Sequence, residues 1–316
     1  ATGRVIRMLD VSFFENLPAE FDWGYLSSGP DLLIGSATKR GAAFKNFWGG
    51  ASEGWYDAKS GDATGKVCSD TLFAYEKSSG KVKWQYNSGV LINSTISATK
   101  DRIYLVESRN KDILEAQTRR ITDPKLWQDQ YLVAIDRTTG KRIWEYSLAT
   151  EPGTVVYYLA QSGDKLSLVA SSGSKYHVYV FDSDEGAANW EQHFAWPKDN
   201  HGGHMSRPAI VGNTLYVRPR AFDIRDGSVL AQSLPAGGCG TYAATNGALF
   251  FRSGNVTVWD REKGTTSSWP RLRPDCWLST IPAGGMLLSP EGGGGCSCGS
   301  WLETSIGFIP LSRLAP

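Results

Sequence analysis

The sequence lacks the features that mark several classes of protein. Among its 316 residues no apolar run approaches the roughly 20 residues that a membrane helix requires, and the first residues contain no signal-like apolar region. Charge of one sign is also lacking, because 33 Lys and Arg residues oppose 32 Asp and Glu residues for a net charge of +1. Nucleic-acid and anionic-membrane binders carry a basic footprint, so neither partner is expected. The motifs HExxH and CxxCH and the Walker and Rossmann phosphate loops are absent as well.

Glycine and aromatic residues, by contrast, are abundant. The chain contains 35 Gly, 12 Trp, 13 Tyr and 12 Phe. This composition favours many short strands and tight turns over long helices. We therefore expect an all-β protein.

An internal repeat organises most of the chain. Each copy has an apolar strand, a polar residue, a turn with glycine and a second strand that usually ends in Trp, so each is expected to form a hairpin. A second hairpin of the same kind precedes each copy. The copies span residues 71–86, 131–146, 178–192, 220–232 and 256–269, and the preceding hairpins span 95–107, 155–170, 209–218, 241–252 and 277–291.

A four-stranded antiparallel unit of this kind cannot bury both faces alone, so its copies must stack, and radial stacking produces a β-propeller. We expect a single domain over residues 1–316 with six blades; seven or eight remain open if inserted segments contain further strands. The last blade lacks a fourth strand, and residues 2–10 have the pattern of that strand. The N-terminal strand is therefore expected to join the last blade and close the ring. The expected blades cover residues 23–86, 95–146, 155–192, 209–232, 241–269 and the chain from 277.

The repeat resembles a known family. The segments AIDRTTGKRIW (134–144) and AYEKSSGKVKW (74–84) are similar to the PQQ-like propeller repeat of quinoprotein dehydrogenases and bacterial outer-membrane assembly lipoproteins. Other stretches, such as 22–39 and 200–204, look like uncharacterised PQQ-like repeat proteins of planctomycete-type bacteria. The resemblance implies a propeller fold. It does not imply bound PQQ, because the consensus Trp and Gly serve packing and turn formation.

The longer loops of the expected propeller emerge on one face. Long loops on a rigid scaffold usually carry the binding site, so we place a ligand site there. All five cysteines lie on these loops or at their edges. Disulfides in an exported protein, periplasmic or extracellular, are one interpretation; thiolate ligation of a soft metal is the other, and an odd number leaves one thiol over. The cysteines are Cys68, Cys239, Cys276, Cys296 and Cys298.

Histidines on the same face indicate a metal. His201 and His204 lie in the segment Asn-His-Gly-Gly-His, and His193 ends the preceding strand. Neutral imidazoles suit a transition metal such as Cu, Zn or Mn. A structural loop and metal-free acid–base catalysis are the alternatives.

Charged and aromatic side chains complete the predicted site. The arginines are expected to bind carboxylate or phosphate groups, and Glu107 to act as an acceptor or base, unless these charges simply pair with one another. The tryptophans are expected to stack on sugars or to anchor the loops. The residues are Glu107, Arg109, Arg207, Arg218, Arg252, Glu291, Trp48, Trp196 and Trp301.

This inventory favours an exported enzyme, a lyase or a metal-dependent enzyme, acting on a carbohydrate or uronic-acid-type substrate. Its expected catalytic residues are His201, His204, Glu107 and Arg207. Its partner would be a small molecule or an oligosaccharide. Two alternatives stay open: a non-catalytic scaffold that holds another protein, and a redox protein that binds PQQ or copper.

Overall fold

The chain forms an all-β structure that consists of two compact units. The computed structural model describes residues 5, 7–11, 20–42, 65–197, 206–235, 241–270, 272, 280–290 and 305–309. Unit 1 comprises Ala1–Leu168 and Phe181–Ala188, and unit 2 comprises Val169–Val180 and Asn189–Pro316. No helix in the described part of the chain is long and apolar enough to cross a membrane.

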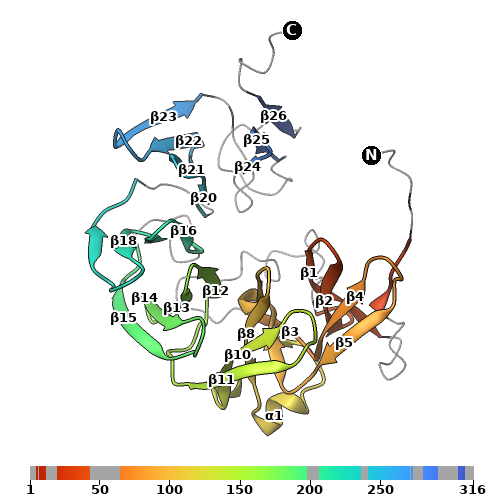
Figure 1. Ribbon diagram of the computed structural model, residues 1–316. Coiled ribbons are helices and arrows are strands. Elements are labelled where there is room, and N and C mark those ends of the chain that lie inside the picture. Colours follow the sequence, from red (N-terminus) through yellow and green to blue (C-terminus); the bar gives the residue numbers. More distant parts are fainter. Residues whose placement is uncertain are drawn as a thin grey trace. The chain divides into compact units, whose positions relative to one another are not determined.

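The first two sheets belong to unit 1 (Figure 1). The first has the antiparallel order β1 (Phe21–Ser28), β2 (Leu32–Lys39), β4 (Thr71–Glu76) and β5 (Val82–Tyr86). The second is larger, with the order β11 (Arg142–Leu148), β10 (Gln130–Asp136), β8 (Arg102–Ser108), β6 (Val90–Ile92), β3 (Lys66–Ser69) and β9 (Arg120–Ile121), while β7 (Ser97–Ala98) also pairs with β8. Helix α1 (Lys111–Leu114) and the 3-10 turns η3 (Asn93–Thr95) and η4 (Pro124–Trp127) lie in the connections.

Three further four-stranded antiparallel sheets follow along the chain. The third contains β12 (Tyr157–Ser162), β13 (Lys165–Ser172), β14 (Lys175–Asp182) and β15 (Ala188–Ala195). The fourth contains β16 (Ala209–Val211), β17 (Thr214–Val217), β18 (Arg220–Asp223) and β19 (Val229–Ala231). The fifth contains β20 (Ala243–Ala244), β21 (Ala248–Ser253), β22 (Asn255–Asp260) and β23 (Thr265–Trp269).

The last sheet has three strands in the described part of the chain: β24 (Ile281–Ala283), β25 (Met286–Ser289) and β26 (Ile306–Phe308). The prediction of an all-β propeller built from four-stranded antiparallel blades is confirmed. Within the described residues the structure supports five blades and not the six predicted, because five sheets have at least four strands there and the sixth has three.

The predicted ring closure is not shown. The described residues of the N-terminal segment, 5 and 7–11, contain no strand. Leu9 and Val11 pack with Ala37 and Phe73, and the Tyr75 hydroxyl donates to the carbonyl oxygen of Asp10 at 2.8 Å. The described part of the segment therefore lies against the first sheet.

The repeat consensus has a direct structural cause in the β10–β11 turn. Asp136 Oδ1 accepts hydrogen bonds from the backbone N–H of Thr138 and Thr139 at 3.0 and 2.7 Å, so these two N–H groups of the turn have a partner. Gly140 then takes a φ of +71°, a left-handed conformation that favours glycine. The indole Nε1 of Trp84 donates to Arg137 O at 3.0 Å, and its ring covers Gly140.

The same contact recurs further along the chain. Trp144 donates to Ser183 O at 3.3 Å and covers Gly186. Trp190 donates to Ile224 O at 2.8 Å and covers Gly227. The tryptophan of one outer strand therefore packs on the hairpin turn of the next sheet, as the packing interpretation of the consensus predicts.

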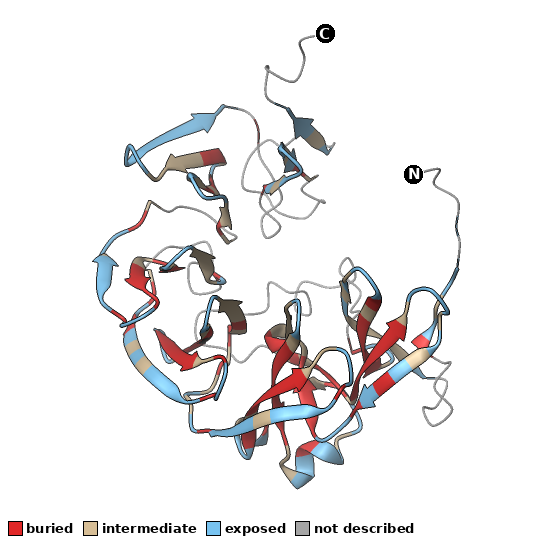
Figure 2. Cartoon of the chain, viewed as in Figure 1, coloured by how far each residue is buried: buried red, intermediate tan, exposed pale blue. Residues whose placement is uncertain are grey.

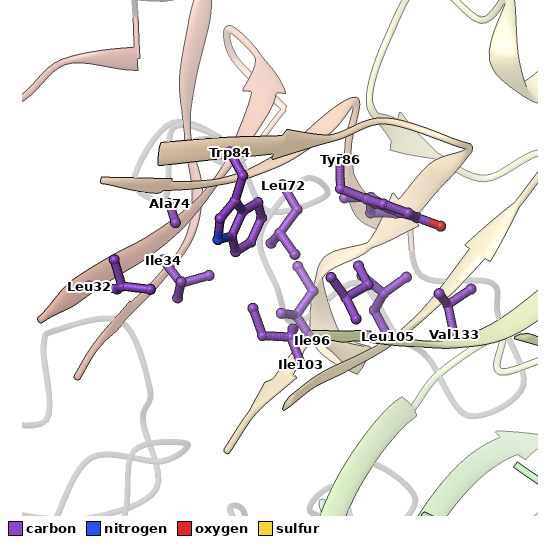
Figure 3. Packing of buried hydrophobic residues seen from close by; sticks show 12 residues of the cluster. Leu32, Ile34, Leu72, Ala74, Trp84, Tyr86, Ile96, Ile103, Leu105 and Val133 are labelled. Carbon is purple, nitrogen blue, oxygen red and sulfur yellow. The ribbon is translucent and has the colours of Figure 1, made fainter. Parts of the chain in front are cut away.

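The core of unit 1 lies between its two sheets. Figure 3 shows Trp84 and Tyr86 of β5 together with Ile103, Leu105 and Val133 of the second sheet in one cluster. Burying an aliphatic side chain of this size stabilises the fold by about 1.5–3 kcal/mol. The outer strands are much more exposed, as the pale blue of β11 and β23 in Figure 2 shows.

Candidate functional site

Glu107, a predicted catalytic residue, lies in a closed ionic cluster next to the end of β8. Its side chain is fully buried, and its Oε1 accepts hydrogen bonds from the Tyr86 hydroxyl at 3.1 Å and from Arg109 Nε at 2.8 Å. Arg109 Nη2 also contacts Glu145 Oε2 at 2.5 Å, and the same oxygen binds Arg142. The structure thus joins Glu107 and Arg109 directly, as two partners of one ion pair.

The electrostatics of this cluster follow from burial. Burial raises the pKa of Glu107, while hydrogen bonds from Arg109 and Tyr86 oppose the shift. Burial, followed by the nearby Glu107 carboxylate, raises the pKa of Tyr86 to about 12. The Arg109 guanidinium also lies 4.0 Å from the centre of the Tyr131 ring, within cation–π range. A general base must reach its substrate, and this carboxylate has no exposed surface.

A second buried ion pair orders the long connection between β8 and β10. Arg119 is 3% exposed, and its Nε and Nη2 donate to Asp70 Oδ1 at 2.9 and 2.6 Å. The same guanidinium donates to Leu114 O at 3.0 Å and Ala116 O at 2.7 Å. Both nitrogens share one carboxylate oxygen, and hydrogen bonds between charged groups are stronger than those between neutral groups. Sequence reasoning missed both residues, since no local pattern relates two positions 49 apart.

Lys66 and Cys68 lie next to this pair on β3. Lys66 Nζ donates to Thr154 O at 3.0 Å and Val155 O at 2.8 Å, and burial lowers the pKa of Lys66 to about 7. Cys68 is a buried free thiol whose pKa burial raises to about 12. The disulfide expected for Cys68 is therefore not formed, and the high pKa suppresses the reactive thiolate. The burial of Lys66 could not be predicted from the sequence, because a lysine at an alternating position of a strand is ordinary.

The predicted arginines and tryptophan of unit 2 are described individually. Arg218 and Arg252 are each 4% exposed, whereas Arg207 is exposed. Arg218 opposes the pKa increase that burial causes at Tyr242. Trp196 is 8% exposed and packs edge-to-face on Tyr176 at 6.5 Å. Trp196 is therefore part of the core of unit 2 and has little surface to offer a ligand.

His193, a predicted metal ligand, lies against a second histidine. Its Nδ1 lies 2.9 Å from Nδ1 of His177, on the neighbouring strand β14. Within the described ranges, no group of three or more His, Cys, Asp and Glu residues is arranged to hold a metal. The remaining predicted residues lie outside the described residues: Trp48, His201, His204, Cys239, Cys276, Glu291, Cys296, Cys298 and Trp301.

Comparisons with known proteins extend these observations. The chain is similar to the solved structure of BamB from Moraxella catarrhalis, with 16% identity, a TM-score of 0.45 and coverage of 72% of this chain and 67% of that one. It is also similar to a quinohemoprotein alcohol dehydrogenase from Pseudomonas putida HK5, with 14% identity, a TM-score of 0.44 and coverage of 72% of this chain and 48% of that one. A third similar structure is a europium-containing methanol dehydrogenase, with 13% identity, a TM-score of 0.43 and coverage of 72% of this chain and 59% of that one.

The chain thus spans about half the length of the alcohol dehydrogenase. No curated protein matches it significantly. None of these findings bears on the expected similarity to planctomycete-type proteins, which stays a prediction. The family model described as outer membrane protein assembly factor BamB matches residues 63–269, more than half of the sequence, and the chain belongs to that family of PQQ-like repeat proteins.

Proposed function

We propose that the protein is a non-catalytic scaffold that holds a protein partner during the assembly of outer-membrane proteins, in the periplasm. The family description supports the class of process. The observation that carries a binding role is the outer strand β23, which offers an uncharged and exposed sheet edge.

Strand β23 is longer than β19, which is also uncharged, and it differs from the outer strands β5, β11 and β15 in carrying no charge. All five residues of β23 (Thr-Thr-Ser-Ser-Trp) are exposed, and β22 is its one strand partner in the described part of the chain. The other three strands carry Lys83, Arg142 with Glu145, and Glu191, respectively. Charges on an edge strand prevent pairing with foreign chains, so their absence from β23 favours the addition of a partner strand.

An aromatic anchor lies at the end of this edge. Trp269 is 39% exposed, and its ring stacks on Phe308 with 6.4 Å between centroids and 19° between planes. Exposed Trp residues are enriched among the side chains that dominate binding energies. An extended polypeptide with alternating apolar residues, as in an outer-membrane strand, matches an edge with this anchor.

The carbohydrate-directed enzyme expected from the sequence lacks comparable support. Glu107 is buried against Arg109 and Tyr86, and His201 and His204 lie outside the described residues. An anionic quinone such as PQQ needs unpaired cationic side chains. Arg109 and Arg119 are each bound to carboxylates, so these residues do not fit the cofactor.

The test measures binding of an edge variant. A fluorescent peptide of about ten residues, patterned as an outer-membrane strand, is titrated with the full chain and followed by anisotropy. Ser267→Lys places a charge in the middle of β23 without touching the core, because Ser267 is exposed. We expect its dissociation constant to rise about tenfold, which corresponds to 1.4 kcal/mol.

The matched control is Gln85→Lys, which adds the same charge at an exposed position of β5, an edge that already carries Lys83. It should leave peptide affinity unchanged. Equal affinities for the wild type and Ser267→Lys contradict the proposed edge. Turnover of a uronic-acid-containing polysaccharide by the purified wild type contradicts the non-catalytic role.

The proposal also includes closure of the ring by the N-terminal segment. Arg7 Nη2 donates to Ser78 O at 3.3 Å, and its guanidinium covers Gly80, whose φ is +71°. This contact resembles the Trp84–Gly140 contact, which supports an outer-strand position for residues 7–11. We propose this segment as the fourth strand beside β26. Photo-cross-linking from a benzoylphenylalanine at Met8, which is 86% exposed, should label residues 305–309; labels confined to β4 and β5 contradict closure.

A further inference from the structure

Two histidines on adjacent strands of the third sheet face each other. His177 lies on β14 and His193 on β15, which are neighbours in the sheet. The Nδ1 atoms lie 2.9 Å apart, and the rings are inclined by 62° with 5.0 Å between centroids. Tyr179, two residues after His177, packs edge-to-face on His193 at 5.8 Å. One ring is held in the sheet and the other is accessible, since His177 is 7% exposed and the His193 side chain 40%.

The second nitrogen of each ring has an oxygen nearby. Ser172 Oγ lies 3.5 Å from His177 Nε2, and Glu191 Oε1 lies 3.7 Å from His193 Nε2. The carboxylate of Glu191 favours a proton on His193 Nε2, which leaves Nδ1 of His193 as an acceptor. His177 then donates from Nδ1, and its Nε2 accepts from the Ser172 hydroxyl. In this arrangement a single proton lies between the two Nδ1 atoms.

A metal ion can replace that proton at small cost. The His177 proton moves from Nδ1 to Nε2, and the Ser172 hydroxyl changes from donor to acceptor, a role that a hydroxyl fills equally well. Both imidazoles stay neutral, as metal ligation requires. The accessible His193 ring can turn its Nδ1 lone pair toward a shared ion while His177 stays fixed.

We propose that His177 and His193 form a two-nitrogen site for a square-planar divalent ion, Cu(II) in the first place and Ni(II) in the second. With metal–nitrogen distances of about 2.0 Å, cis nitrogens lie about 2.8 Å apart in a square plane and about 3.3 Å apart in a tetrahedron. The observed 2.9 Å is set by the hydrogen bond between the rings; it lies closer to the square-planar value, so a square-planar ion needs the smaller change in the nitrogen–nitrogen separation. Solvent or a chelating ligand supplies the other positions on the exposed side of His193.

This inference goes beyond the proposed scaffold function. It also differs from the sequence prediction, which grouped His193 with His201 and His204 and left His177 out. Together these are the four histidines of the chain, so variants can assign every imidazole that binds.

The experiment titrates the full chain with Cu(II)–nitrilotriacetate. The chelator leaves few coordination positions of the copper ion open, so the complex selects paired histidines over single ones. Electron spin echo envelope modulation counts the bound imidazoles. We expect one chelate per chain with two equatorial imidazoles. His193→Gln should weaken binding by about tenfold or more, since losing even an outer-shell partner of a metal site has an effect of this size, and should remove the two-imidazole signature.

The matched control is the double variant His201→Gln/His204→Gln, which should bind the chelate as the wild type does. His193 is exposed, so its variant tests the site without disturbing the core, and circular dichroism verifies the fold. A wild type that shows a single imidazole overturns the proposal. So does a double variant that loses the chelate while His193→Gln keeps it, because the site would then lie in the Asn-His-Gly-Gly-His segment.

Discussion

The contact between Trp84 and Gly140 can be tested by a matched pair of glycine substitutions. Gly140 and Gly163 both have a left-handed backbone, with φ values of +71° and +59°. A Cβ on Gly140 would lie 2.5 Å from Trp84 Cδ2, whereas a Cβ on Gly163 would meet nothing within 4 Å. Alanine at either position therefore has the same backbone strain, and Gly140→Ala alone disturbs the packing of an indole.

The expected magnitudes follow from these two effects. A left-handed alanine costs about 1–2 kcal/mol, so Gly163→Ala should lose about that much stability. Gly140→Ala should lose about 1–3 kcal/mol more through overpacking, and about 0.5–1.5 kcal/mol beyond that if the hydrogen bond from Trp84 to Arg137 O is broken.

Equilibrium urea unfolding followed by circular dichroism measures the difference. With a slope of about 2 kcal/mol/M, the midpoint of Gly140→Ala should lie at least about 0.5 M below that of Gly163→Ala. Equal midpoints would refute the reasoning, because the Trp–Gly contact would then contribute nothing beyond the turn conformation that both glycines share.

Two further predictions concern the buried residues of β3. Burial lowers the pKa of Lys66 to about 7, so its contribution to stability is fully present above the unfolded pKa of about 10.4 and is lost as the pH falls toward 7. The unfolding midpoint of the wild type should thus rise between pH values of about 7.5 and 9.5 by more than that of Lys66→Met; parallel profiles would contradict this assignment. Burial also raises the pKa of Cys68 to about 12, so Cys68→Ala should leave the number of Ellman-reactive thiols unchanged in the native protein and lower it by one in guanidinium chloride, whereas a lower native count would show that Cys68 is accessible.

The hairpins of the fold were predictable because their causes are local. Alternating apolar residues, an Asp that accepts from the next N–H groups and a glycine with positive φ all lie within a few residues, as at Asp136 and Gly140. The strands at β14, β22 and β25 follow from the same pattern. The N-terminal segment was harder, because whether it pairs with another strand depends on partners far away in the sequence.

The candidate site was predictable only in part. Glu107 and Arg109 were identified by their position at the end of a strand, and they are in contact. Their chemistry was not predictable, since it depends on Tyr86 and Glu145, which approach from other strands. His177 was left out of the predicted site, because nothing in the sequence indicates that β15 brings His193 to its Nδ1.

The sequence by itself determined the all-β class and the hairpin turns, because these arise from backbone conformation and from hydrogen bonds between near neighbours. The Trp–Gly packing contacts join residues that are far apart in the sequence, as Trp84 and Gly140 are, and they were predictable because the same Trp and Gly recur in the repeat. Tertiary structure alone decided the pairing of β3 with β6 and β9, whose residues lie outside the predicted hairpins. It also decided which charges are buried together, such as Arg119 with Asp70. Such pairs form where folding removes water from two groups at once, and the energy of that step depends on everything that surrounds them.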